Sequence, residues 1–387
     1  MLIPTFNRAD FLSECIDSIL TQSLTPSQVL VVNDGSTDRT QQVLDAYGND
    51  VEIVEEAHKG KPAALNAGLP VVTGEYLWIF DDDDVALPDA VERFVEPLEA
   101  SPEYGFTYSS FYYTATEAGS TRLGPVVGMS TVPDVDEQGF LVALLESNFL
   151  GGAALFARRS CYETVGEFDQ ELLRSQDYDM AIRIARQFTG VRVVGAPTFH
   201  YRQHDGQRGA NRDRFDASQR FPKWLQYDQI IFSRLYRELP LVDYLPVGRD
   251  VDELRRQAHL QRLSVLASKL LVDEACAELS VVAGLSADRG GFSEEERRLV
   301  GTLATAPYYG VGRLVDHPRV AGHMRELARN SPVIRQLRTE LVRTLACQPN
   351  SRRPWRAVRQ FAEVIQTSVG LYGRAGRSFL GQGGPGR

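Results

Sequence analysis

The sequence predicts an α/β fold: a mixed, mostly parallel sheet with helices on both faces, followed by an α-helical extension. Two observations support this prediction. Strand and helix signals alternate over the first half of the 387 residues, and strand signals nearly stop after about residue 213. Strands that alternate with helices at short spacing form parallel sheets that helices cover on both sides. The composition is that of a globular chain, with 43% hydrophobic and 24% charged residues.

The expected strands are short apolar runs bounded by turn residues. The clearest is QVLVV at residues 28–32, which ends in the turn sequence Asn33-Asp34-Gly35-Ser36. We expect a loop at residues 124–136, which are rich in glycine, proline and valine. The full set of expected strands is 2–3, 28–32, 51–54, 75–80, 104–114, 151–157 and 191–194.

Helices are expected where apolar residues recur at spacings of three and four. One short helix begins near Pro62 and ends at Gly68, in keeping with the preference for proline at a helix start and glycine at its end. The last residues, GRAGRSFLGQGGPGR at 373–387, are expected to be disordered. The expected helices are 9–21, 37–47, 63–67, 177–188, 252–281, 294–305 and 320–346.

The charge is unevenly distributed. Residues 1–318 hold 29 Lys and Arg against 48 Asp and Glu, whereas residues 319–387 hold 13 Arg, no Lys and 3 Glu. The acidic body argues against a nucleic-acid-binding protein, so we expect no nucleic-acid partner. The basic segment suggests contact with something anionic, either a membrane surface or the acidic body itself, and a dimer contact is a further alternative.

Nothing in the sequence indicates export or a membrane-spanning helix. Four scattered cysteines form no zinc or disulfide pattern, and the N-terminus MLIPTFNRADF has no signal-peptide character. No run of 18 apolar residues occurs. We therefore expect a cytoplasmic protein, with peripheral contact at the inner face of the plasma membrane as an open alternative.

Four consecutive carboxylates, Asp81–Asp84, directly follow the apolar run EYLWIF. They therefore lie at the carboxyl end of an expected central strand, where ligands bind in open α/β sheets. Crowding them there is unfavourable unless a cation shares the site, and Mg²⁺ or Mn²⁺ typically binds through carboxylates and substrate phosphates. The motif predicts metal-assisted diphosphate binding, with a solvated acidic face as the alternative.

Three further motifs point to the same crevice. Asp34 ends another strand, and the basic sequence HKGKPAALNAG at residues 58–68 opens a helix whose N-terminus could hold an anion. In SQDYD at residues 175–179, a carboxylate either acts as a general base or merely favours the helix dipole. The absence of GxGxxG and GxxxxGK[ST] argues against a dinucleotide or P-loop enzyme.

Together these motifs resemble the family-2 inverting glycosyltransferases, nucleotide-diphospho-sugar transferases of the GT-A fold. The resemblance rests on residues 3–23, 29–40, 59–88 and 148–185 and covers residues 2 to about 205. It implies a GT-A catalytic domain at 1–213, a helical extension at 214–372 and the disordered tail.

The resemblance also implies roles for individual residues. Asp177 corresponds to the catalytic base, and Gln176 replaces the usual glutamate before it. Asp83 corresponds to the metal ligand of the Asp-x-Asp motif; His204 is a further candidate near the diphosphate, or else a structural residue. Asp82 is the alternative to Asp81 at the ribose, because the tetrad leaves the register open by one residue. The implied donor site comprises Pro4, Thr5, Asn7, Asp34, Lys61, Asn66, Asp81 and Asp82, and the acceptor side comprises Gly152 and Gln176.

The implied activity is Mg²⁺- or Mn²⁺-dependent transfer of a sugar from a nucleoside-diphosphate sugar, with UDP or dTDP expected, to an acceptor hydroxyl. Cell-surface polysaccharide, glycolipid or natural-product glycosylation would fit. A sugar-nucleotide nucleotidyltransferase and a non-catalytic sugar-nucleotide-binding protein are the alternatives. The sequence names neither the sugar, the acceptor and the linkage nor the oligomeric state, and it leaves open whether the true start lies upstream of Met1.

Overall fold

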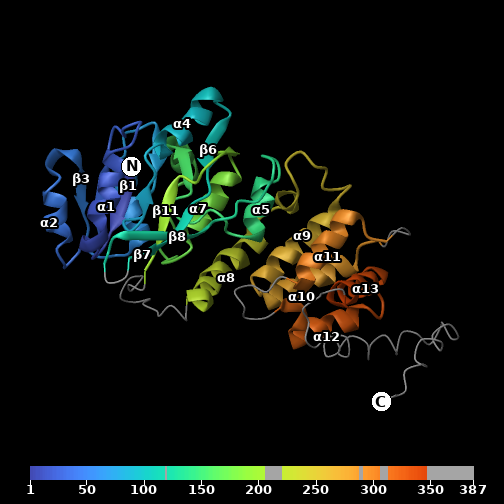
Figure 1. Cartoon of the computed structure of the whole chain (residues 1–387). Coiled ribbons are helices and arrows are strands. Elements are labelled where there is room, and N and C mark those ends of the chain that lie inside the picture. The colour runs from blue at the N-terminus through green and yellow to red at the C-terminus, as the bar shows by residue number, and fades with distance from the viewer. Residues whose placement is uncertain (118–119, 205–219, 287–290, 306–312, 347–387) are drawn as a thin grey trace, which may run out of the picture. The chain divides into compact units, whose positions relative to one another are not determined.

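The structure is a computed structural model that describes residues 1–117, 120–204, 220–286, 291–305 and 313–346. The chain divides into two compact units, Met1–Asp250 and Val251–Arg387 (Figure 1). All strands of the described residues belong to the first unit, and the second is helical where it is described. The predicted α/β class with a C-terminal helical region is therefore confirmed.

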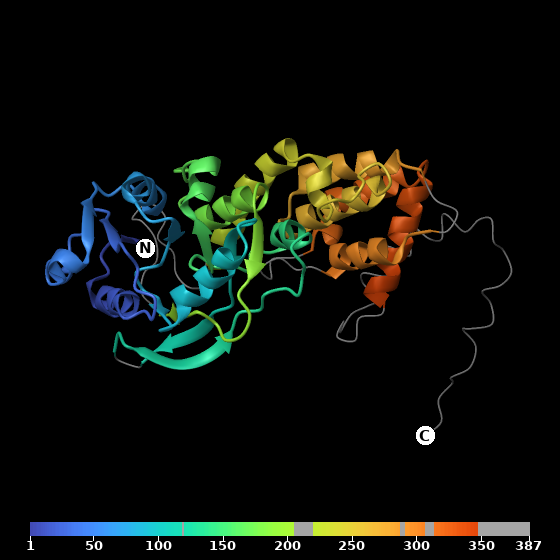
Figure 2. The ribbon, with the colours of Figure 1, turned by 90° about the horizontal axis from the view of Figure 1, so that it is seen from above.

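The first sheet is parallel and consists of β1 (Leu2–Thr5), β2 (Leu30–Asn33) and β3 (Glu52–Glu55), in that order. Every residue of β1 and β2 is buried, which agrees with their continuous apolar sequence. Helices α1 (Ala9–Leu20) and α3 (Lys61–Gly68) lie on opposite sides of this sheet (Figure 2).

The second sheet is mixed and consists, in spatial order, of β10 (Thr189–Arg192), β6 (Tyr104–Tyr108), β9 (Leu155–Arg158) and β4 (Tyr76–Trp78). It adjoins the first sheet, because Leu2 forms a parallel bridge with Ile79 and its carbonyl accepts the Phe80 N–H at 3.0 Å. The chain after β4 therefore leaves the sheet beside the carboxyl end of β1.

The third sheet has the order β5 (Val85–Ala86), β11 (Phe199–Gln203), β7 (Tyr112–Thr116) and β8 (Leu123–Met129). The loop predicted at residues 124–136 is wrong for its first part, since residues 124–129 belong to β8. β8 pairs antiparallel with β7 alone, as an edge strand. Edge strands tolerate proline and glycine, because one side of the backbone needs no partner within the sheet.

The remaining helices of the first unit cover the sheets and link them. Arg234 of α8 (Arg220–Glu238) forms ion pairs with Asp169, at 2.9 Å, and with Asp179 of α7 (Gln176–Ala185). Helix α8 thus packs within the first unit, although it lies beyond residue 213. The division into a catalytic domain at 1–213 and a helical extension at 214–372 stays a prediction. The others are α2 (Thr40–Asp45), α4 (Ala90–Ala100), α5 (Phe140–Glu146) and α6 (Arg159–Val165), with 3-10 turns at Gly48–Asp50, Leu69–Val71 and Leu241–Tyr244.

The second unit contains α9 (Arg255–Ser268), α10 (Val272–Ala283), α11 (Glu294–Thr305), α12 (Pro318–Leu327) and α13 (Pro332–Ala346), with a 3-10 turn at Leu314–Asp316. The predicted helix at 252–281 is divided in two where Leu270 has a φ of +53°. Among the described residues no helix is long and apolar enough to cross a membrane. Residues 347–387, which include the expected disordered tail and most of the basic segment, lie outside the described residues.

Gly190→Ala is expected to lower the free energy of unfolding by about 1–3 kcal/mol or more, because β10 crosses directly over an aromatic ring. A Cβ at residue 190 would meet the buried ring of Phe106 at 2.1 Å. Gly128→Ala in β8 is the matched control, because its nearest neighbour, Tyr113, would lie at an ordinary 3.6 Å. Urea unfolding of both variants checks the prediction, and equal midpoints would contradict it.

Candidate active site

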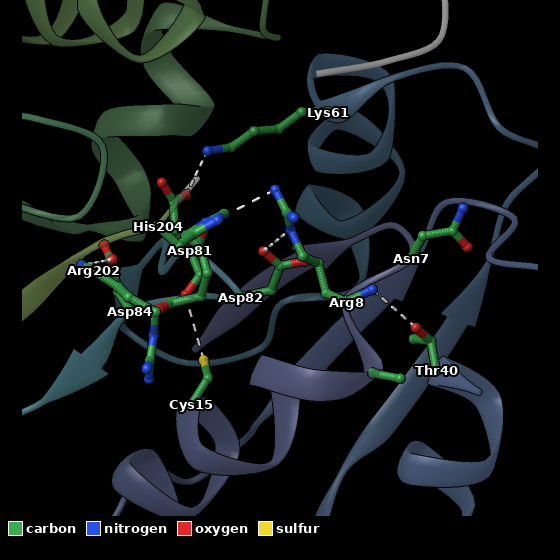
Figure 3. Close-up of polar contacts among 12 residues, drawn as sticks. Asn7, Arg8, Cys15, Thr40, Lys61, Asp81, Asp82, Asp84, Arg202 and His204 are labelled. Carbon is green, nitrogen blue, oxygen red and sulfur yellow. Dashed lines mark hydrogen bonds and ion pairs between the residues drawn. The ribbon is translucent and has the colours of Figure 1, made fainter. Parts of the chain in front are cut away.

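The candidate site lies where three parallel strands of the first unit end. β1 leads into Phe6-Asn7-Arg8, β2 leads into Asp34, and the chain after β4 leads into Asp81–Asp84. These segments are adjacent because β1 pairs with β2 on one side and contacts Ile79 on the other. Open α/β sheets bind ligands at this edge. Figure 3 shows Arg8, from the end of β1, pointing toward Asp82, which follows β4.

Asp34 organises the loop before α3. Its side chain is buried, and its two oxygens accept the backbone N–H groups of Lys59 and Gly60, both at 2.8 Å. The ring of His58 lies 3.1 Å from the same carboxylate and stacks on Phe6, with ring centroids 3.8 Å apart. The predicted nucleotide contact of Asp34 is therefore a carboxylate that also fixes the residues 58–60.

The residues at the end of β1 connect this strand to the turn after β2. Pro4 and Thr5 are buried in the sheet, and the Thr5 carbonyl accepts the Asp34 N–H at 2.9 Å. Asn7 has a φ of +53°, which asparagine tolerates better than most residues, and its Oδ1 accepts the Thr37 N–H at 2.7 Å. The structure therefore gives Asn7 a structural contact at the rim of the predicted nucleotide site.

Each of the first three aspartates of the tetrad faces a basic side chain. Lys61 Nζ lies 2.5 Å from Asp81 Oδ1, Arg8 Nε lies 3.7 Å from Asp82 Oδ1, and His204 Nε2 lies 2.8 Å from Asp83 Oδ2 (Figure 3). Burial opposes the charge of Lys61, but the nearby Asp81 and Asp177 outweigh it and raise its pKa above the usual value. The site is thus a compact array of alternating charges.

The pKa of Asp82 is shifted by its surroundings. Burial, together with the charges of Asp83 and Asp81, raises the pKa of Asp82 to about 7, and the Arg8 guanidinium opposes this shift. A carboxyl group whose pKa lies near neutrality responds to any added cation, since a positive charge favours its ionised form. The protonation state of Asp82 is therefore sensitive to a cation bound beside it.

Strand β11 brings His204 to the tetrad. It pairs antiparallel with β5, which directly follows the tetrad, so its last residues run back past Asp84 and Asp83. Arg202 is fully buried; its N–H donates to Asp84 Oδ1 at 2.9 Å and its Nε–H donates to the Asp83 carbonyl at 2.7 Å. The buried arginine thereby holds the turn in which the carboxylates lie.

Three members of the tetrad could share a cation. Oxygen atoms of Asp81, Asp83 and Asp84 lie within 4.8 Å of one another. Carboxylate oxygens at this separation suit Mg²⁺ or Mn²⁺, which prefer hard oxygen ligands. The residues present thus fit a divalent cation, and Asp84 joins the predicted ligand Asp83 in the group.

A pocket adjoins the tetrad on the side of β9 and α7. Asp177 lines it and is half-buried, and desolvation raises the pKa of Asp177, with Lys61 opposing and Asp81 adding to the shift. Gln176 is 5% exposed, and its Oε1 has no hydrogen-bond partner among the described residues. The polar wall consists of Lys61, Asn148, Gly152, Gln176 and Asp177, and the apolar wall includes Leu65, Ile79, Leu155, Phe168 and Met180.

Two predicted residues shape this pocket through their contacts. A Cβ at Gly152 would lie 3.0 Å from Asp81 Oδ2, so the missing side chain leaves room for that carboxylate. Asn66 exchanges two hydrogen bonds with the backbone of Phe168, at 2.8 and 2.9 Å. The amide of Asn66 is thus occupied in holding a pocket wall, whereas the sequence predicts it at the nucleotide.

The start of α7 separates the two carboxylates of the SQDYD motif. Asp179 is buried and pairs with Arg183, at 2.9 Å, and with Arg234. Asp177 instead lines the pocket. Ser175, which precedes the helix, has a left-handed φ of +56°, and its hydroxyl donates to Asp228 of α8 at 2.9 Å. Helix α8 therefore supports the segment that carries Asp177.

Comparison with known proteins shows what the first part of the chain is similar to. The family model described as glycosyl transferase family 2 matches residues 1–163. The first part of the chain is therefore similar to glycosyl transferase family 2.

Curated proteins with similar sequences include glycosyltransferases and a polysaccharide synthase. An uncharacterized glycosyltransferase of Rickettsia felis is 29% identical over 188 residues, which are 48% of this chain and 31% of the relative. The chondroitin synthase of Pasteurella multocida is 28% identical over 47% of this chain and 18% of its own length. The glycosyltransferase EpsJ of Bacillus subtilis, also uncharacterized, is 24% identical over 53% of this chain and 60% of its length. The chain thus spans less than a third of the first two relatives.

The solved structures to which the chain is similar include glycosyltransferases. S. aureus TarS superimposes with a TM-score of 0.49 at 14% identity, over 89% of this chain and 53% of TarS. The mannosyltransferase PcManGT of Pyrobaculum calidifontis gives a TM-score of 0.46 at 20% identity, over 89% of this chain and 86% of its own.

Asp34→Asn is expected to lower the free energy of unfolding by about 1–3 kcal/mol. The reason is that the amide NH₂ would face the backbone N–H of either Lys59 or Gly60, which now donate to the two carboxylate oxygens. Asp45→Asn on the exposed face of α2 is the control, with an expected change below about 0.5 kcal/mol. Chemical denaturation compares the two, and a similar loss in both would contradict the role given to Asp34.

Sequence reasoning missed Arg8, Arg202 and the contribution of Asp84 to the carboxylate group. Arg8 directly follows the predicted Asn7, so a basic residue at a strand's carboxyl end was the available signal. Arg202 gives no such signal, because its role depends on the pairing of β11 with β5 more than 110 residues earlier in the chain. An arginine two residues before a candidate His204 looks like an ordinary surface charge in sequence.

Proposed function

We propose that this chain is a metal-dependent inverting glycosyltransferase that moves a sugar from a nucleoside-diphosphate sugar to an acceptor hydroxyl. One observation carries the proposal: three carboxylates that could hold a cation adjoin a pocket whose wall contains the half-buried Asp177. A transferase needs these two features side by side, since one serves the leaving diphosphate and the other the attacking hydroxyl. The sugar would end in cell-surface polysaccharide, glycolipid or a natural product.

On the donor side, Asp83 would hold the cation together with Asp81 and Asp84, and His204 would orient Asp83 through the contact at 2.8 Å. A bound Mg²⁺ or Mn²⁺ offsets negative charge on the leaving diphosphate. UDP or dTDP is the nucleotide that the resemblance implies. Asp34 and the loop that it fixes would border the nucleoside, while Asp82 is placed by Arg8 to contact the ribose or the cation.

On the acceptor side, Asp177 would remove the proton from the attacking hydroxyl. Its raised pKa supports this role, because a carboxylate is a stronger base when burial disfavours its charge. The positive charge of Lys61 interacts with both Asp81 and Asp177 and would favour the ionised form of Asp177 before substrate binds. Gln176 Oε1, which has no hydrogen-bond partner in the described part of the chain, would accept a hydrogen bond from a hydroxyl of the bound substrate.

A thermal-shift panel tests the donor assignment. UDP-, dTDP- and GDP-sugars are added with and without Mn²⁺, since a ligand that binds only the folded state raises its midpoint of unfolding. We expect stabilisation by one nucleotide class, and only with the divalent cation. Stabilisation that is equal with and without Mn²⁺ would contradict metal dependence, and no stabilisation by any nucleotide sugar would contradict the donor class.

A further inference from the structure

Arg8 occupies an intermediate position among the carboxylates of the tetrad. Its Nε lies 3.7 Å from Asp82 Oδ1, and one terminal nitrogen lies 3.9 Å from Asp83 Oδ2. Both separations exceed hydrogen-bond distance, whereas Lys61 contacts Asp81 at 2.5 Å. The interaction of Arg8 with these two acids is therefore Coulombic, without the fixed fork geometry of a bidentate pair. Figure 3 shows the Arg8 side chain reaching from the end of β1 toward Asp82 and His204.

The backbone of Arg8 is anchored independently of its side chain. Its N–H donates to Thr40 Oγ1 at 3.1 Å, and its carbonyl accepts the N–H groups of Phe11 and Leu12 at 2.9 and 3.0 Å, which begin α1. The guanidinium is mostly buried, with 18% of the side chain exposed. A change of side-chain partner would therefore leave the start of α1 in place.

A cation at Asp83 would change the balance of charge around Arg8. The acid that Arg8 faces at 3.9 Å belongs to the group that could hold a divalent ion. Two positive groups beside the same carboxylate repel each other, and the guanidinium then gains by moving to a new anion. A diphosphate on the same cation supplies that anion, and its oxygens match the planar donors of arginine.

We propose that Arg8 exchanges partners, from Asp82 and Asp83 in the metal-free site to the donor diphosphate when a cation is bound at Asp83. The inference rests on the proposed function. Arg8 then disfavours the cation alone but favours cation and diphosphate together, so it couples the two binding events. Such coupling is reciprocal: the nucleotide must tighten cation binding by the same factor as the cation tightens nucleotide binding.

Arg8→Gln is the test, because glutamine keeps a polar side chain and removes the charge. Mn²⁺ binding to the full chain is measured by the electron paramagnetic resonance signal of free Mn²⁺, first alone and then with saturating UDP or dTDP. We expect the variant to bind Mn²⁺ alone about tenfold more tightly and the nucleoside diphosphate with Mn²⁺ about tenfold more weakly, a range typical of coupled sites. Arg8→Lys, which keeps the charge, should lie between the variant and the wild type.

Arg39→Gln is the matched control, because this arginine is 73% exposed and pairs with Asp10 at the surface. It should leave both affinities unchanged. If Arg8→Gln weakens both ligands or changes neither, Arg8 has no exchange role and the inference is wrong. A variant that unfolds at lower temperature and binds neither ligand would be replaced by Arg8→Lys, whose failure to reduce the coupling would also overturn it. If the wild type binds neither Mn²⁺ nor nucleoside diphosphate, the proposed function itself fails.

Discussion

Asp177→Asn is expected to lower sugar transfer by about 10²–10⁴-fold, the contribution of a positioned general base, while donor binding changes by less than about threefold. The structure gives the physical reason. Asp177 is half-buried and lines the pocket, and asparagine keeps the shape of the side chain but cannot take a proton. Initial rates with saturating donor, together with calorimetric donor binding, separate the two effects. A variant that loses donor binding as well would contradict the assignment.

Asp179→Asn is the matched control for this prediction, because Asp179 lies two residues further along α7 and forms ion pairs with Arg183 and Arg234. It should lower the stability of the domain, and any loss of transfer should follow the fraction of folded protein. The pH profile adds a second check. Since burial raises the pKa of Asp177, the rising limb of the rate should lie above the usual aspartate value of 3.8, with activity lost as pH falls through it. A limb at or below 3.8 would contradict the role of Asp177.

Asp83→Ala is expected to abolish Mn²⁺-dependent donor binding and to reduce transfer by at least about 10²-fold, since charge stabilisation of the leaving group is among the largest catalytic terms. The substitution removes one of three carboxylates within 4.8 Å, and with it the oxygen that His204 Nε2 contacts at 2.8 Å. Titration with Mn²⁺, with and without nucleoside diphosphate, measures the loss directly.

Asp10→Ala controls for the removal of one negative charge near the site, because Asp10 is 61% exposed and pairs with Arg39. It should bind Mn²⁺ as the wild type does. If Asp83→Ala also retains the wild-type affinity, the cation does not bind at the tetrad. Asp81→Ala and Asp84→Ala would then be equally silent, and the acidic run would serve only the fold.

The sequence predicted the elements whose signals are local. β1 and β2 are continuous apolar runs ending in turn residues, and α1 and α11 show helical spacing, so their positions follow from burial alone. The pairing of β8 with β7 could not be predicted, because an edge strand of glycine, proline and valine has the composition of a loop. The packing of α8 under α7 depends on ion pairs between distant residues, such as Arg234 and Asp179.

The same distinction applies to the site. Asp34 and Asp81–Asp83 follow strands that lie on the two sides of β1 and end at the same edge, so their meeting could be predicted from the alternation of strands and helices. The individual side-chain contacts of the site could not be predicted. They depend on the geometry of the turns that follow the strands, and no local sequence pattern indicates that geometry. Asn7 and Asn66 show this, since both amides bind backbone groups of other segments. Arg8 and Arg202 show the converse, as residues without a motif that the fold brings to the carboxylates.

Analysis of the products formed from the donor tests directly whether the chain transfers a sugar. The full chain is incubated with Mn²⁺ and the nucleotide sugar that stabilises it best, and the released compounds are identified by chromatography and mass spectrometry. Our account predicts release of the nucleoside diphosphate, dependent on Mn²⁺ and lost in Asp177→Asn. Formation of nucleoside triphosphate and sugar 1-phosphate on addition of pyrophosphate would indicate a nucleotidyltransferase instead. No product from a donor that binds would indicate a binding protein, and either result would contradict the account.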